Sequence, residues 1–166
     1  MEEFSLDDFK SQFETNFFGI IPVTKEVIPI MRRQSSSSSS SSTIVNVSSV
    51  GGRIGIPLNS VYISSKFALE RLYESMRYKL QEFGINIILI EPGVVKTNFF
   101  ENAKVANNPV NEKSSYTQLM PKLYESFKPM LENSSSSPSQ VAEVIFKAVI
   151  SKDAEIRYLI GNDPLI

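Results

Sequence analysis

Two short apolar runs, separated by one long amphipathic segment, restrict the possible folds of this chain most. Residues 43–47 (TIVNV) form a β-branched run, and residues 86–90 (NIILI) are almost entirely apolar. Between them, residues 61–82 place apolar side chains at helical spacing, and Gly84 follows as a helix-ending signal. Apolar strands joined by a helix indicate two parallel strands, covered on both faces, with a crossover connection.

The same alternation continues toward the end of the chain, where a helix is predicted over residues 139–150 and a strand over residues 156–160. Strands and helices in alternation are typical of a doubly wound α/β fold. With 166 residues, of which 42% are apolar, the chain has the size of one domain with a substantial core. We therefore predict a single α/β domain over residues 1–166, with about three parallel strands and flanking helices.

The N-terminal segment predicts a helix that is interrupted by a proline. Ser5 can cap this helix, acidic residues follow in its first turn, and apolar residues recur at helical spacing: Phe9, Phe13, Phe17 and Ile20. Pro22 has no backbone N–H to donate, so we expect a kink or break near Ile21 before the helix continues over residues 23–31. Aromatic stripes on helices usually pack in a core or a subunit contact, and we interpret this stripe as packing.

Two serine-rich tracts, residues 35–42 and residues 134–137, offer no apolar surface to bury. The first is an unbroken run of eight serines. We interpret both tracts as flexible, low-complexity surface insertions. Phosphorylation or partner binding is the alternative, but surface loops accept insertions so readily that we assign the tracts no function.

Charge and composition exclude several classes of function. Seventeen basic and eighteen acidic residues give a net charge of -1, which predicts no nucleic-acid partner. The absence of His and Cys removes imidazole bases, thiolate nucleophiles, disulfides and the usual zinc ligands, so we predict no metal site. The acidic N-terminus and the lack of a long apolar run predict no secretory signal and no transmembrane segment, and hence a cytoplasmic protein.

Tyr62 and Lys66 are the residues best suited to acid–base chemistry. They lie four apart in the helix predicted over residues 61–82, so their side chains share one face. A phenol ionises at about pH 10, but a neighbouring ammonium favours the phenolate, so we predict that Lys66 lowers the pKa of Tyr62. The spacing recurs at Tyr124 and Lys128, but only the first pair follows a serine, Ser49, at the end of a predicted strand.

In this strand, loop and helix, the chain resembles the short-chain dehydrogenase/reductase family over about residues 9–98. The resemblance implies a Rossmann-like fold and a set of catalytic residues. Tyr62 would be the general acid/base on the substrate oxygen, and Ser49 would hydrogen-bond the same oxygen. Lys66 would lower the pKa of Tyr62 and contact the cofactor ribose. Asn16 matches the family's asparagine that holds a water molecule for proton relay.

Residues 92–97 (PGVVKT), directly after the second predicted strand, match the Pro-Gly segment with which the family contacts the nicotinamide ring. The resemblance therefore implies NAD or NADP as cofactor, with contacts from Tyr62, Lys66, Pro92, Gly93, Val95 and Thr97. Residues 51–55 (GGRIG) form another glycine cluster after a strand. Pro57 follows and no helix is predicted to begin there, so we expect these glycines to serve turns and not a phosphate site.

The glycine-rich cofactor turn of the family has no match in the chain, since no glycine precedes Asn16. The resemblance thus implies the C-terminal portion of the domain, an incomplete doubly wound sheet without the dinucleotide-binding half, whose strand at residues 43–47 has an open edge. We predict an oxidoreductase that transfers hydride between NAD(P) and an alcohol or ketone. Residues 67–70 (FALE) and 90–97 resemble the hydroxysteroid and retinol dehydrogenase branch, which implies a lipophilic substrate. In the family the helices that match the first and third helices of this chain often form a dimer interface, so the resemblance also implies a homodimer. The alternative is a truncated, non-catalytic remnant or binding protein.

Overall fold

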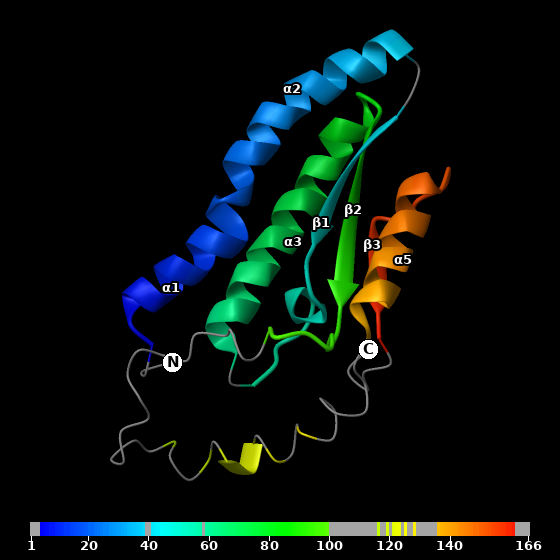
Figure 1. Cartoon of the computed structure of the whole chain (residues 1–166). Helices are drawn as coiled ribbons and strands as arrows, with labels where there is room; N and C mark the ends of the chain where they lie inside the picture. Colours follow the sequence, from blue (N-terminus) through cyan, green and yellow to red (C-terminus); the bar gives the residue numbers. More distant parts are fainter. Residues whose placement is uncertain are drawn as a thin grey trace.

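The computed structural model describes residues 4–38, 41–57, 59–99, 116, 119, 121–123, 125, 128 and 136–161. Within these residues one parallel sheet has the order β1-β2-β3, formed by β1 (Ser42–Val47), β2 (Ile85–Pro92) and β3 (Arg157–Ile160) (Figure 1). In this part of the chain β1 pairs with β2 alone, so one edge of β1 is unpaired. The predicted α/β fold with three parallel strands is confirmed.

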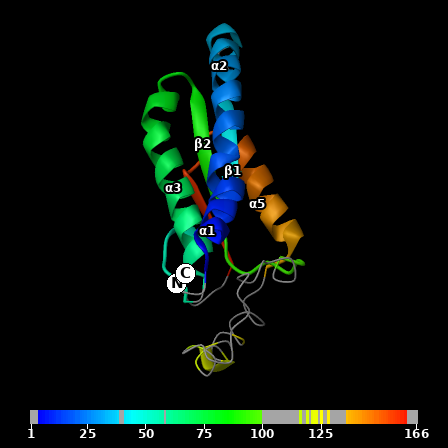
Figure 2. The same cartoon turned by 90° about the vertical axis from the view of Figure 1, so that its left-hand side faces the viewer.

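Helices lie on both faces of the sheet (Figure 2). One face packs against α2 (Ile20–Ser38) and α3 (Ser60–Gln81), and the other against α5 (Pro138–Ile150). A short 3-10 helix, η2 (Val50–Gly52), connects β1 to the loop before α3. The three predicted helices over residues 61–82, 139–150 and 23–31 are thus present; the first two differ from the prediction by at most one residue at each end, whereas α2 extends well beyond both predicted ends.

The core explains why the second apolar run is so uniform. Ile85, Ile87 and Leu89 of β2 pack with residues of α3, whereas Ile88 and Ile90 pack with α5. Successive side chains of a strand point to opposite faces, so a strand covered on both sides needs apolar residues at every position. In this buried central strand the only charged side chain is Glu91, next to Pro92 at the carboxyl end of the strand.

The N-terminal helix is interrupted by a π-helix instead of a proline break. Ser5 caps α1 (Leu6–Phe13) in a capping box with Asp8, as predicted. The chain then continues as the π-helix η1 (Glu14–Phe18), closed by a 2.8 Å hydrogen bond from the Gly19 N–H to Glu14 O. Since α2 begins at Ile20, Pro22 lies in its first turn, where a backbone N–H has no helical partner. The predicted break near Ile21 was therefore wrong in position and cause.

The prediction of a flexible insertion over residues 35–42 was wrong for the residues that the structure describes. α2 continues through Ser38, and Ser42 opens β1 with a 2.9 Å hydrogen bond from its N–H to Gly84 O. Serine has only moderately low helix propensity, and its hydroxyl can bond to a carbonyl of the preceding turn. Ser36 and Ser37 do so, donating to Arg32 O and Gln34 O at 2.9 and 3.0 Å.

The second serine tract also has defined structural contacts at its end. Ser136 is buried and pairs as an isolated bridge with Val95, and Ser137 is the N-cap of α5 in a capping box with Gln140. Residues 134–135 lie outside the described residues. A serine run therefore reads as low complexity in the sequence although some of its members supply the hydrogen bonds that begin a helix.

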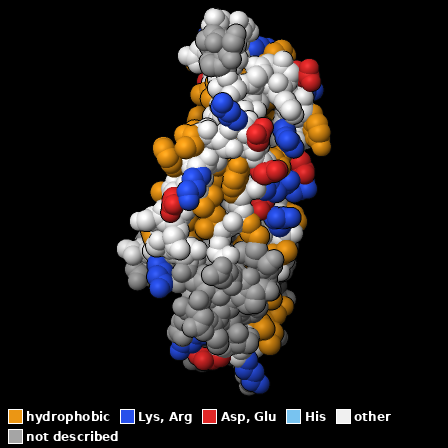
Figure 3. All heavy atoms as spheres, turned by 90° about the vertical axis from the view of Figure 1, so that its right-hand side faces the viewer, with side chains coloured by type: hydrophobic (Ala, Val, Ile, Leu, Met, Phe, Trp, Pro, Cys, Tyr) orange, Lys and Arg blue, Asp and Glu red, His pale blue; other side chains and the backbone are white. Residues whose placement is uncertain are grey.

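The surface over α5 mixes apolar and charged side chains (Figure 3). On this helix Phe146, Val149 and Ile150 are all well exposed. Across the described residues, no helix has the length and apolar character needed to cross a bilayer, and no group of His, Cys, Asp or Glu side chains is arranged to hold a metal ion. The homodimer and the cytoplasmic location stay predictions.

Candidate active site

Three of the four predicted catalytic residues come from two neighbouring segments at the carboxyl ends of the strands. Ser49 follows β1, and Tyr62 and Lys66 lie in the first two turns of α3. A 2.7 Å hydrogen bond from the Ser48 N–H to Ile90 O extends the β1–β2 pairing to this edge. In parallel α/β sheets the carboxyl ends of the strands are where ligands bind, and Pro92 ends β2 at the same edge.

Ser49 is held by the turn that it begins. Its backbone is extended, and its Oγ accepts a hydrogen bond from the Gly51 N–H at 3.1 Å as the N-cap of η2. The same hydroxyl donates a long, 3.5 Å hydrogen bond to Pro92 O. Ser49 is thus placed between the turn after β1 and the end of β2.

Gly51 and Gly52 allow this turn to lie directly against α3. A Cβ on Gly51 would come within 2.5 Å of Ile63 Cδ1, and one on Gly52 within 2.7 Å of Glu70 Cγ. Neither glycine has a positive φ, so close packing and not an unusual backbone conformation requires them. The prediction that they serve a turn is right in part, because the turn is the 3-10 helix η2, but close contact with α3 is the stronger constraint.

Tyr62 is half-buried beside Ser49 and Phe99. Its ring makes an edge contact with the Phe99 ring at a centroid distance of 5.8 Å. Burial raises the pKa of Tyr62, and a hydrogen bond with the Ser49 side chain lowers it by a smaller amount. The net pKa lies above its ordinary value, which keeps the phenol in its protonated form at neutral pH.

The lowering of the Tyr62 pKa by Lys66 stays a prediction, since the shift of that pKa in this structure has burial as its largest cause and the Ser49 hydrogen bond as its second. Lys66 Nζ lies 5.8 Å from the centroid of the Tyr62 ring and donates a 3.1 Å hydrogen bond to Val47 O. At this separation the desolvation of the phenol is the larger effect. Burial also lowers the pKa of Lys66, opposed by the nearby carboxylate of Glu70.

Asn16 is joined to the site through a serine that the sequence analysis missed. Asn16 lies in the π-helix η1, and its Nδ2 donates to Ser65 Oγ at 3.0 Å. The buried Ser65 hydroxyl donates in turn to Tyr62 O at 2.7 Å. Asn16 is therefore connected to the turn of α3 that carries Tyr62 and Lys66. π-Turns are often found at functional sites, although periodicity does not reveal them.

The segment after β2 is held in place by backbone hydrogen bonds. The Gly93 N–H donates to Ile160 O at 2.8 Å, and Val95 forms a parallel bridge with Ser136. Thr97 is exposed, and its Oγ1 accepts a 3.2 Å hydrogen bond from the Phe99 N–H. The segment after β2 thus leads away from the carboxyl end of the strand, and its predicted cofactor contacts are Pro92, Gly93, Val95 and Thr97.

This combination of a parallel sheet and a serine, tyrosine and lysine at its carboxyl edge defines a class of enzyme fold. Residues 1–108 match the family model described as short chain dehydrogenase. The chain belongs to the short-chain dehydrogenase/reductase family.

Individual relatives support the same assignment. Retinol dehydrogenase 8 of Bos taurus is 35% identical over 161 residues, which cover 95% of this chain and 50% of that protein. A short-chain dehydrogenase from Streptomyces avermitilis has a TM-score of 0.76 and 28% identity, covering 98% of this chain and 56% of that one. A short chain dehydrogenase/reductase from Burkholderia phymatum, solved in complex with NAD, shares the fold with a TM-score of 0.72 and 22% identity over 95% of this chain and 55% of that one. The chain spans about half the length of these proteins.

Proposed function

We propose that this chain carries the catalytic residues of an NAD(P)-dependent oxidoreductase that interconverts an alcohol and a ketone. The observation that carries the proposal is that the Ser49 and Tyr62 side chains lie beside each other at the carboxyl ends of the strands, with Lys66 one helical turn further on. Membership of the family supports the reaction class. The NAD complex of the Burkholderia protein supports the cofactor class, NAD or NADP.

Tyr62 acts as general acid when a ketone is reduced and as general base when an alcohol is oxidised. A phenol whose pKa is raised by burial is protonated and ready to donate to the substrate oxygen. Ser49 holds the same oxygen by a hydrogen bond, since its hydroxyl already lies beside Tyr62. When bound, the nicotinamide supplies or accepts the hydride.

The donors at this edge fit a nicotinamide cofactor. An ammonium has three hydrogen-bond donors, and Lys66 Nζ uses one on Val47 O, so two can serve the ribose hydroxyls. Pro92, Gly93, Val95 and Thr97 extend from the end of β2 and would line the nicotinamide ring. Asn16, linked to α3 through Ser65, would keep the proton path to Tyr62 in place.

A lipophilic substrate is the finer part of the proposal. It is supported by the likeness to bovine retinol dehydrogenase 8 and by Phe99, whose half-exposed ring packs against Tyr62. An apolar ring next to the reacting phenol favours a carbonyl carried on an apolar group.

Cofactor binding is the first experiment. NADH and NADPH are titrated separately into the protein and followed by the fluorescence of the reduced nicotinamide, and turnover is then measured with lipophilic ketones. Saturable binding of one cofactor and turnover that Tyr62→Phe abolishes would support the proposal. Tyr78→Phe is the matched control, because Tyr78 is an exposed tyrosine on the same helix.

No binding of either cofactor up to millimolar concentration would count against the proposal. That result would favour the second candidate, a non-catalytic binding protein. Binding without turnover by any ketone of the panel would favour the same candidate.

A further inference from the structure

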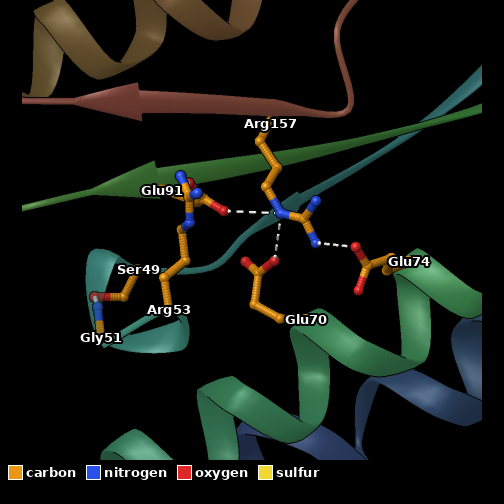
Figure 4. A network of polar contacts seen from close by, with 7 residues as sticks. All are labelled: Ser49, Gly51, Arg53, Glu70, Glu74, Glu91 and Arg157. Carbon is orange, nitrogen blue, oxygen red and sulfur yellow. Dashed lines mark hydrogen bonds and ion pairs between the residues drawn. The ribbon is translucent and has the colours of Figure 1, made fainter. Parts of the chain in front are cut away.

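A group of charged side chains behind the site connects distant elements of the fold (Figure 4). Glu70 of α3 and Glu91 of β2 are fully buried, and both carboxylates lie 3.2 Å from the same atom, Nε of Arg157 on β3. Buried carboxylates are costly unless cations and hydrogen bonds compensate them. The burial of these two side chains therefore depends on their arginine partners.

Arg157 alone does not satisfy both buried carboxylates. Its Nε carries one hydrogen, which is donated to Glu70 Oε2, and its Nη2 lies 3.1 Å from Glu74 Oε1. Glu91 Oε2 instead accepts a 3.3 Å hydrogen bond from Nη1 of Arg53. Burial and the charge of Glu70 raise the pKa of Glu91, whereas the two arginines lower it. Arg53 thus supplies the hydrogen bond that Glu91 Oε2 accepts.

Arg53 belongs to the turn that holds the catalytic serine. The Gly52 and Arg53 amides donate to Ser49 O and Val50 O at 2.8 and 2.9 Å, and Ser49 Oγ accepts from the Gly51 N–H. The ion pair of the Arg53 side chain with Glu91 therefore also restrains Ser49, which lies in the same backbone turn. Gly52 of the same turn lies directly against Glu70.

We infer that Arg53 is a positioning residue for Ser49: its ion pair with Glu91 keeps the η2 turn on the end of β2, and so keeps the Ser49 hydroxyl beside Tyr62. The importance of Ser49 and Tyr62 rests on the proposed function. The Arg53–Glu91 ion pair and the hydrogen bonds of the η2 turn are made within this chain and involve no cofactor or substrate. Arg53 acts through Ser49 and not on the substrate.

The test replaces Arg53 and follows the turn by NMR. In Arg53→Gln, we expect the Gly51 amide to exchange with solvent roughly fivefold faster, the effect of losing an ion pair worth about 1 kcal/mol. The pKa of Tyr62, measured on ¹³C-labelled tyrosine and assigned with Tyr62→Phe, should rise, because the hydrogen bond with Ser49 that lowers it is weakened. Ser49→Ala sets the largest rise that loss of this bond can produce.

Two further variants separate positioning from general destabilisation. Arg53→Lys keeps the charge near Glu91 and should restore most of the Gly51 protection and of the Tyr62 pKa. Lys147→Gln breaks an exposed ion pair with Glu143 on α5 and should change neither quantity.

The inference is overturned if Arg53→Gln leaves both quantities unchanged, or if Lys147→Gln shifts them equally. It is also overturned if Arg53→Lys behaves like Arg53→Gln. None of these measurements uses cofactor or turnover. A failure to bind NADH or NADPH would therefore refute the proposed function without deciding the role of Arg53.

Discussion

Replacing Arg157 with leucine should remove a large part of the stability of the fold. Arg157 is only 19% exposed, and it is the cation nearest to the fully buried Glu70 and Glu91. Removing one partner of a buried ion pair typically costs about 3–5 kcal/mol, because the remaining charge stays buried without compensation. The total stability of a domain is about 5–15 kcal/mol, so we expect Arg157→Leu to be folded marginally at pH 7.

The loss of unfolding free energy in Arg157→Leu should increase as the pH rises. Arg157 lowers the pKa of Glu91, so without it burial holds that pKa further above the value in the unfolded chain. A carboxyl with a raised folded pKa contributes stability below its unfolded pKa and loses it as the pH rises through the folded pKa. The difference between the wild type and Arg157→Leu should therefore be smallest near about pH 4 and grow toward pH 7.

Urea unfolding followed by circular dichroism, at about pH 4 and at pH 7, measures the difference in unfolding free energy between the wild type and Arg157→Leu at each pH. A loss below about 1 kcal/mol at pH 7, or an equal loss at both pH values, would refute the reasoning from buried charge. Combining Arg157→Leu with Glu70→Gln and Glu91→Gln is the control. It should recover more than half of the loss, because neutral amides cost less to bury than unpaired carboxylates.

Three further predictions follow from the contacts of single residues. Gly52→Ala should lower the free energy of unfolding by about 1–3 kcal/mol, because the added methyl group meets the side chain of Glu70, which is held by its ion pair. Gly51→Ala should lower it by less, because the added methyl group meets the movable end of the Ile63 side chain. Equal losses for the two variants in urea unfolding would contradict this. Ser137→Ala should cost about 1 kcal/mol through the lost α5 N-cap, with an unchanged midpoint as the contrary result. Tyr62→Phe should abolish NAD(P)-dependent ketone reduction and leave the unfolding midpoint within about 2 °C of Tyr78→Phe; residual turnover near the wild-type rate would remove Tyr62 from the mechanism.

Periodicity predicted the sheet and its helices because their residues are sorted by burial. The run at residues 86–90 is apolar except for Asn86 since β2 is covered on both faces, and Gly84 ends the preceding turn with φ +67°. The spacing of Tyr62 and Lys66 likewise predicted that they share a helix, which the structure places next to Ser49.

The features that the sequence did not reveal depend on contacts between distant residues. Glu70 and Arg157 are 87 residues apart in the sequence. Judged from its own segment, each of them would be predicted to be a charged residue on the solvent-exposed surface. The π-helix around Asn16 follows from packing, since propensity does not distinguish it from an α-helix. The raised pKa of Tyr62 was missed because the extent of its burial depends on neighbours such as Phe99, which come from another segment.

The position of the first serine tract affects how the gene can vary. α2 extends to Ser38 at the edge of the sheet opposite to the site, where Ser42 begins β1 (Figure 1). Each serine added to the helix would lengthen it by about 1.5 Å at that far edge. Homologous genes that differ in the number of serine codons should therefore encode the same catalytic geometry, and the length of this repeat can drift without selection on the chemistry.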